Sequence, residues 1–234
     1  MIRKLIIAAL LCSSATAQLT TQMGKKPTAA ASWTVIDAAR AHTWTCGGAS
    51  TCNVTANTTG ATGEVVFVGS YGVSPVCTSS GNSFTEIGPY IRYTQYGALF
   101  YTLSPVTSST QVFHCTGQYI VVTVVAFQGG VPTLDAFAFD NSSAGTAVVS
   151  PAVSGELLIS GVMTYTGSNL TCWLPTNTSF SLLDFVQFSS GVSVPGASAY
   201  YVDPFMVSVG PQWPIYSCGF NDWSAGVVIL VAFK

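Results

Sequence analysis

The sequence predicts an all-β fold, and three observations carry the prediction. Runs rich in Val, Ile, Phe and Tyr recur along the chain and are bounded at short intervals by Gly, Pro, Asn and Ser, the pattern of strands and turns. Charged residues make up only 7% of the 234-residue chain and apolar residues 49%, which is enough to fill a core. Six cysteines follow an N-terminal export signal, an even number typical of disulfide bonds. We therefore expect a disulfide-bonded antiparallel β-sandwich.

Residues 1–17 have the composition of a signal peptide. Arg3 and Lys4 precede the apolar run 5–12, and small and hydroxyl residues then lead to Ala17, after which we expect cleavage. The apolar run is too short to span a bilayer and no later run is long enough, so we expect no membrane span. Residues 18–32 contain Thr, Gln, Lys and Ala and predict a flexible N-terminal segment. The expected location is secreted, outside the cell or on its surface.

Four runs predict the central strands of the sandwich: 64–71, 119–128, 156–165 and 225–234. Two of them, 119–128 and 225–233, are almost continuously apolar, which predicts burial on both faces. The prolines fall mainly between such runs, where a missing N–H costs least. Only residues 35–41 favour a helix, and we expect one turn there at most.

An internal duplication organises the chain, because residues 62–128 and 154–234 carry the same landmarks in the same order. The landmarks are Gly-Glu-Val-Val-Phe at 63–67 and Gly-Glu-Leu-Leu-Ile at 155–159, a cysteine at 77 and 172, Ser-Phe-hydroxyl at 83–85 and 179–181, Gly-Ala-x-x-Tyr at 97–101 and 196–200, a second cysteine at 115 and 218, and Val-Ala-Phe at 125–127 and 231–233. Glu64 and Glu156 are expected to occupy the same place in both copies. The order predicts a sandwich of jelly-roll type built from two pseudo-repeated halves.

Residues 33–234 are expected to form a single β-sandwich domain. The link between the two copies, residues 129–154, contains the run Leu-Asp-Ala-Phe-Ala-Phe at 134–139, whose apolar side chains need a core. A flexible spacer would lack such a run. Two small tandem sandwiches remain the alternative.

The duplication also favours a disulfide pairing. The six cysteines are Cys46, Cys52, Cys77, Cys115, Cys172 and Cys218. Because Cys77 and Cys115 recur as Cys172 and Cys218, these two pairs are favoured as equivalent bonds. Cys46 and Cys52 would then join each other across a turn-rich loop.

The composition disfavours several functions. Beyond residue 17 there are nine acidic and five basic residues with no basic cluster, so we expect no nucleic-acid partner. Two histidines and the lack of C-x-x-C spacing disfavour a metal site, and no phosphate loop or nucleophile elbow predicts a cofactor or a catalytic residue. We expect no enzyme. A glycosidase or lyase is a weaker alternative that would need two of the carboxylates at 64, 86, 135, 140, 156, 184, 203 and 222.

Aromatic residues are the candidate ligand-binding groups. Trp173, Trp213 and Trp223 lie in loop-like sequence near cysteines, and Tyr90 and Tyr96 are expected on one face of a strand. Flat exposed rings can stack on sugars, which would make the protein a carbohydrate-binding module with a glycan partner. The alternative is that these rings pack against disulfides and cover the edges of the core.

The runs Gly-Glu-Leu-Leu-Ile-Ser-Gly at 155–161 and Val-Ala-Phe-Lys at 231–234, with Ser/Thr/Gly-rich strands between them, resemble uncharacterised secreted bacterial proteins of the jelly-roll or concanavalin A-like β-sandwich type. The resemblance covers residues 32–234. It implies a sandwich fold and export, and it brings no catalytic residues to carry over.

The leading hypothesis is a non-catalytic extracellular β-sandwich that acts in surface attachment or self-assembly, as a matrix or filament subunit. In a homo-oligomer or filament, residues 18–32 would add a strand to a neighbour's sheet. A carbohydrate-binding module is the second hypothesis, and a glycosidase or lyase is less favoured.

Overall fold

The computed structural model describes residues 32–42, 50–141, 146–165, 179–186, 196–205, 208–211 and 225–234, which belong to one compact unit, Ala31–Lys234. These residues form strands and no helix, so the all-β prediction is confirmed. The predicted signal peptide and residues 18–31 lie outside the described residues. Within the described ranges, no helix is long and apolar enough to cross a membrane.

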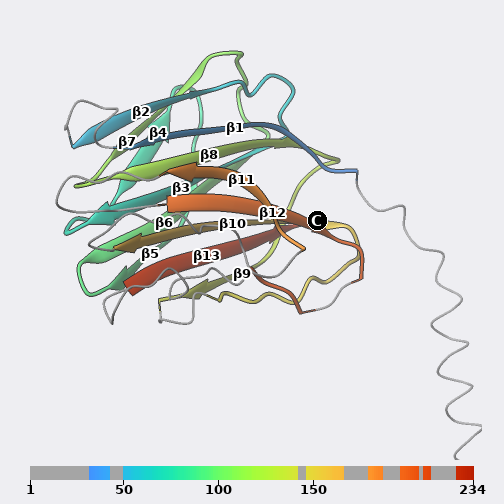
Figure 1. Cartoon of the computed structure of the whole chain (residues 1–234). Helices are drawn as coiled ribbons and strands as arrows, with labels where there is room; N and C mark the ends of the chain where they lie inside the picture. Colours follow the sequence, from blue (N-terminus) through green and yellow to red (C-terminus); the bar gives the residue numbers. More distant parts are fainter. Residues whose placement is uncertain are drawn as a thin grey trace, which may run out of the picture. The chain divides into compact units, whose positions relative to one another are not determined.

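Thirteen strands follow one another along the described parts of the chain (Figure 1). They are β1 (Thr34–His42), β2 (Thr51–Ala56), β3 (Gly63–Tyr71), β4 (Val76–Ser79), β5 (Thr85–Arg92), β6 (Gln95–Leu103), β7 (Gln111–Thr116), β8 (Val121–Gln128), β9 (Leu134–Asp140), β10 (Glu156–Tyr165), β11 (Ser181–Val186), β12 (Gly196–Asp203) and β13 (Ala225–Phe233). The helical turn expected at 35–41 is wrong, since this segment lies in β1. Pairing with β8 along its length overrides the helix propensity of its alanines.

Three antiparallel sheets result. Sheet A has the order β1-β8-β3-β6-β5, sheet B the order β2-β7-β4, and sheet C the order β11-β12-β10-β13-β9. The four runs expected to be central form β3, β8, β10 and β13, and none of these lies at a sheet edge. The side chains of β8 up to Phe127 and those of 226–233 in β13 are buried, as their apolar sequences predict.

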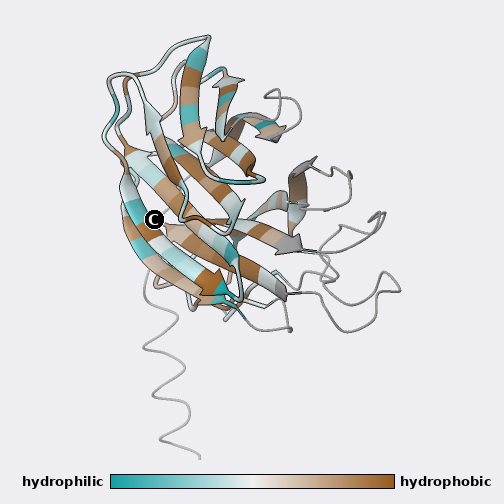
Figure 2. Ribbon diagram, turned by 90° about the vertical axis from the view of Figure 1, so that its left-hand side faces the viewer, coloured by the Kyte–Doolittle hydropathy of each residue, from teal (hydrophilic) through white to brown (hydrophobic). Residues whose placement is uncertain are grey.

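Sheets A and C pack face to face over the largest core. Val65, Phe67 and Leu99 from sheet A meet Leu157, Ile159 and Ile229 from sheet C. Sheet B covers the other face of sheet A, where a second core contains Val66, Val68 and Phe113. The other face of sheet C carries a third core that includes Ala147, Val149 and Phe180. Figure 2 shows apolar and polar residues alternating along many of the strands, as expected when strands have differently solvated faces.

Sheets A and C have the same strand order when β1, β3, β5, β6 and β8 are matched with β9, β10, β11, β12 and β13. The registers agree as well. Phe127 pairs with Gly63 and Val35, and Phe233 pairs with Leu157 and Leu134. The register of the outer strand then shifts next to each phenylalanine, between Val35 and Asp37 in β1 and between Ala136 and Leu134 in β9. We call residues 34–128 the first half and residues 134–233 the second half.

Contacts between sheets A and C follow the same correspondence. A Cβ on Gly97 would lie 2.6 Å from Cγ1 of Val227, and a Cβ on Gly196 would lie 2.8 Å from Cγ2 of Val121. Gly97 and Gly196 hold matching positions in β6 and β12, and Val121 and Val227 hold matching positions in β8 and β13. Each half therefore places a valine over a glycine of the other half.

Candidate functional site

The outer face of sheet B is a polar surface. Burial alternates strictly along β2 and β4, and nearly so along β7, because Cys52, Val54, Cys77, Phe113 and Cys115 point into the second core. The side chains between them point outward. They are Thr51, Asn53 and Thr55 from β2, Val112, His114 and Thr116 from β7, and Val76 and Thr78 from β4. We call these eight residues the outer face of sheet B.

The pairing of the strands arranges these side chains in rows across the sheet. Thr51, Thr116 and Val76 stand opposite one another in one row, and Asn53, His114 and Thr78 in the next. None of the eight residues is Asp, Glu, Lys or Arg. The surface offers hydroxyl, amide and imidazole groups next to methyl groups, which suits an uncharged hydrogen-bonding partner.

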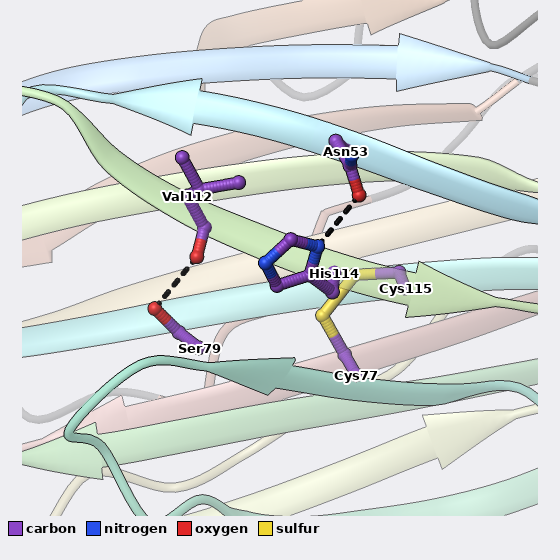
Figure 3. The surroundings of a disulfide bond; sticks show 6 residues. All are labelled: Asn53, Cys77, Ser79, Val112, His114 and Cys115. Atoms are coloured by element: carbon purple, nitrogen blue, oxygen red, sulfur yellow. Dashed lines mark hydrogen bonds between the residues drawn. A yellow bond between two sulfur atoms is a disulfide. The ribbon is translucent and has the colours of Figure 1, made fainter.

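A disulfide lies directly beneath this face. Cys77 and Cys115 are opposite residues of β4 and β7 and are joined, with Cα atoms 4.1 Å apart, so this predicted bond is confirmed (Figure 3). Cys52, opposite Cys115 on β2, is also disulfide-bonded. Its predicted partner Cys46, and the predicted pair Cys172–Cys218, lie outside the described residues. The cross-link holds β4 and β7 in register from below.

Hydrogen bonds fix side chains above and beside the disulfide. The Nδ1 atom of His114 lies 2.7 Å from Oδ1 of Asn53, and with this assignment of the amide the imidazole donates. The Ser79 hydroxyl donates to the carbonyl of Val112 at 2.8 Å (Figure 3), and it accepts from the Gln111 amide. The exposed ring of His114 carries a second hydrogen-bonding atom, Nε2.

Glu64 is fully buried on the side of β3 that faces sheet B. Nδ2 of Asn82 donates to its Oε2 at 3.1 Å. Burial raises the pKa of Glu64 to about 7, and the nearby Thr58 hydroxyl limits the rise. The prediction that Glu64 and Glu156 hold the same place is wrong. Glu64 comes one residue after Gly63, which pairs with Phe127, whereas Glu156 comes one residue before Leu157, which pairs with Phe233. When the two sheets are matched at these phenylalanines, the two glutamates lie two positions apart.

Asp135, the buried Glu156 and the exposed Lys234 form a second acidic site. Lys234 pairs with Asp135, and this hydrogen bond is the main reason that the pKa of Asp135 lies below its usual range. Burial raises the pKa of Glu156, whose Oε1 accepts the N–H of Val153 at 2.8 Å. Asp135 is engaged by Lys234 and by the N–H of Ala152, so both carboxyl groups have partners within the fold. The pair therefore fits a structural role.

The other carboxylates that the structure describes belong to elements outside the outer face of sheet B. The carboxylate of Asp140 accepts the N–H of Thr146 at 2.8 Å, and that of Asp203 accepts the N–H of Phe205 at 3.0 Å. Glu86 is exposed on β5, while Asp222 and the side chain of Asp184 lie outside the description. Among the described residues, no group of three or more His, Cys, Asp or Glu could hold a metal ion.

The aromatic candidates divide into two groups. Trp173, Trp213 and Trp223 lie outside the described residues. Tyr90 and Tyr96 belong to neighbouring strands, and Tyr90 pairs with Gly97 while Tyr96 pairs with Ile91, so they point to opposite faces of sheet A. The expectation of a shared face is therefore wrong. Tyr90 stacks on Phe139, with ring centroids 3.6 Å apart.

Sequence reasoning missed the outer face of sheet B, although a signal was present. The run Thr-Cys-Asn-Val-Thr-Ala at 51–56 alternates polar and buried residues with a period of two. The other two strands could not be joined to it without the pairing. Comparisons of the chain with protein-family models, curated proteins and solved structures found no match.

Proposed function

We propose that this chain is a non-catalytic extracellular attachment protein that holds an uncharged polysaccharide through the outer face of sheet B. The observation that carries the proposal is the arrangement of eight side chains, none of them Asp, Glu, Lys or Arg, in rows over a disulfide-linked sheet. Attachment is the leading hypothesis from the sequence, and polysaccharide is the partner class that the chemistry of this face fits.

Hydroxyl-rich polymers can exchange hydrogen bonds with such a face. Thr51, Thr78 and Thr116 each offer a donor and acceptors, and Asn53 and His114 add an amide and an imidazole. Methyl groups of threonine and Val76 can contact the apolar faces of sugar rings. Because cross-linked strands hold the side chains in place, little freedom is lost on binding, and weak contacts can add up.

Export is part of the proposal. The buried Cys77–Cys115 disulfide supports folding in an oxidising compartment, since such bonds are rare in reducing cytosol. The predicted signal peptide supports the same location.

We further propose that each half has a jelly-roll topology and that the two halves arose by duplication. In the first half, the part β1-β8-β3-β6 of sheet A and the order β2-β7-β4 of sheet B support a jelly roll wound from paired Greek keys. In the second half, a bridge joins Val149, which lies between β9 and β10, to Val209, which lies after β12. This bridge corresponds to the pairing of β2 with β7. An aspartate beside each register shift accepts a loop N–H: Asp37 from Asn57 at 2.7 Å and Asp135 from Ala152 at 3.1 Å.

A depletion assay tests the attachment proposal. Mature protein is incubated with insoluble cellulose, chitin or mannan, and the protein left in solution is measured. We expect retention on at least one polymer, and a loss of at least tenfold in affinity for Thr78→Glu, because a buried unpaired charge at the contact costs more than about 1.4 kcal/mol.

The matched control is Thr94→Glu, which places the same change on the exposed turn between β5 and β6, outside the eight residues of the outer face. It should bind like the wild type. Failure of the wild type to bind any of the polymers would contradict the proposal, as would equal binding by Thr78→Glu.

A further inference from the structure

We propose that strand β9 pairs antiparallel with β9 of a second copy, giving a twofold dimer that extends sheet C across both chains. This interface is separate from the outer face of sheet B, and it uses a described strand in place of the N-terminal segment considered above. The proposal goes beyond polysaccharide attachment and does not depend on it.

Strand β9 lies at the edge of sheet C and presents apolar side chains. Phe137 and Phe139 are 50% and 45% exposed, an unusual fraction for phenylalanine in a strand. Ala136 and Ala138, which point to the other face, pack against the third core. The run from Ala136 to Phe139 contains no charge, no proline and no register shift. Such an edge is a template for another strand.

The hydrogen-bond pattern directs free backbone groups outward at the two phenylalanines. Thr133 and Lys234 exchange both of their backbone hydrogen bonds, at 2.9 and 3.0 Å, which fixes the alternation along the β9–β13 ladder. After the bulge at Asp135, the N–H and C=O groups of Phe137 and Phe139 point away from β13. The next group in this series, the carbonyl of Asn141, accepts a hydrogen bond from Arg92 at 2.7 Å on that outer side.

One register satisfies both the backbone and the side chains. If the twofold axis passes beside Ala138, Phe137 of one copy stands opposite Phe139 of the other, and these are the residues with outward backbone groups. The sequence Phe-Ala-Phe at 137–139 reads the same in both directions, so the pairing is self-complementary. Opposed aromatic side chains stabilise an antiparallel pair. These features favour a second copy over a different partner.

The new aromatic cluster would continue the core between sheets A and C. Phe139 already stacks on Tyr90 of β5, at an interplanar angle of 13°. The amide of Asn141 donates to the carbonyl of Ile91 at 3.1 Å, which places the end of β9 beside the end of β5. A second copy would therefore cover the open end of an apolar layer that exists within one chain.

Three other edge strands, β1, β5 and β4, are less suited to this pairing. In β1, which matches β9 in the first half, Ala38 and Arg40 stand where β9 has Phe137 and Phe139. In β5, Pro89 and a register shift interrupt the ladder, and β4 has only four residues. Charge, proline and short length are the usual protections of an edge.

Sedimentation velocity of the mature protein over a concentration series tests the dimer, with no polysaccharide present. We expect a reversible dimer with a dissociation constant on the order of 10–100 µM, as befits a small interface. Phe137→Lys should sediment as a folded monomer and weaken association at least tenfold. Phe205→Lys is the matched control, because Phe205 is 72% exposed and lies after β12, outside the β9 edge. It should associate like the wild type.

Amide hydrogen exchange provides a second readout. The amides of Phe137 and Phe139 should exchange more slowly as protein concentration rises, in the wild type and in Phe205→Lys but not in Phe137→Lys. A wild type that stays monomeric throughout the series, or a folded Phe137→Lys that still dimerises, would overturn the proposal. Exchange at these two amides that is independent of concentration would overturn it as well.

Discussion

The two halves of this chain have central sheets of the same strand order and differ in their outer layers. Sheets A and C have the same strand order, the same rungs at Phe127 and Phe233 and the same register shift beside them. Outside sheet A, the first half carries the regular, disulfide-linked sheet B. In the corresponding place of the second half, the described residues contain the single bridge of Val149 to Val209. Packing of sheets A and C constrains both halves at once, whereas each outer layer can change alone.

The centre of the molecule shows how two similar sheets pack without clashing. Phe67 and Gly161 hold matching positions in β3 and β10, and so do Gly69 and Met163. A Cβ on Gly161 would overlap the ring of Phe67, and a Cβ on Gly69 would lie 2.5 Å from Cγ of Met163. Each of these positions in sheet A faces the matching position in sheet C. Two large residues at such a pair would clash, and two small ones would leave a void. The chain places one large and one small residue at each pair.

Exchanging the residues of one such pair should give the largest change in stability. Phe67→Gly should lower the free energy of unfolding by about 4 kcal/mol through the cavity that it leaves, and Gly161→Phe alone should be at least as damaging through overpacking. The double variant should recover much of this loss, which urea unfolding would measure. Additive losses in the double variant would show that the two positions do not face each other as equivalents.

The buried glutamates of the two halves should contribute differently to the pH dependence of stability. The pKa of Glu64 is raised to about 7, so between pH 4.5 and 7 the folded protein holds a proton that the unfolded chain has released. Stability from this group is therefore full below pH 4.5 and lost as the pH rises to about 7, a change of roughly 3 kcal/mol. Glu64→Gln should flatten that decline in unfolding experiments across this range.

Glu156→Gln is the matched variant from the second half. Burial also raises the pKa of Glu156, but Val153 donates to its carboxyl and Lys234 lies nearby, so its share of the decline should be smaller. An unchanged pH dependence in Glu64→Gln would contradict the assignment of a protonated carboxyl at that position.

Gly97 and Gly196, the glycines between sheets A and C, give the smallest expected effect. They also test most sharply whether the two halves pack in equivalent ways. Gly97→Ala and Gly196→Ala each push a Cβ into a valine of the opposite half. We expect each to destabilise the protein by about 1–3 kcal/mol, by similar amounts, in thermal or urea unfolding. A large loss in one variant with none in the other would show that the halves do not pack in equivalent ways.

Much of the arrangement of sheets A and C could be predicted from the sequence, because it depends on local patterns. The four central strands are long and apolar, and the repeated Val-Ala-Phe and Gly-Ala-x-x-Tyr runs occupy matching rungs. The repeated Gly-Glu run was misleading, because its two copies lie two positions apart when β3 and β10 are matched by their pairing. The segment 35–41 was misjudged because its alanines favour a helix when tertiary pairing is ignored.

The candidate site could be predicted only in part. The bond between Cys77 and Cys115 follows from the repeated cysteines, and it lies under the outer face of sheet B. The rows of that face depend on which strands are neighbours, and β4 and β7 are separated by 31 intervening residues. No periodicity in the sequence reports a pairing between such distant short strands.

Hydroxyl-radical footprinting of the protein on the polysaccharide that retains it tests the central claim most directly, because it reports the exposure of individual side chains. The account predicts that Val76, which is 54% exposed, and His114 become protected on binding, while Val131 and Phe205, at 86% and 72% exposed, stay as reactive as in solution. Unchanged oxidation of Val76 and His114 in the bound protein would contradict attachment through the outer face of sheet B.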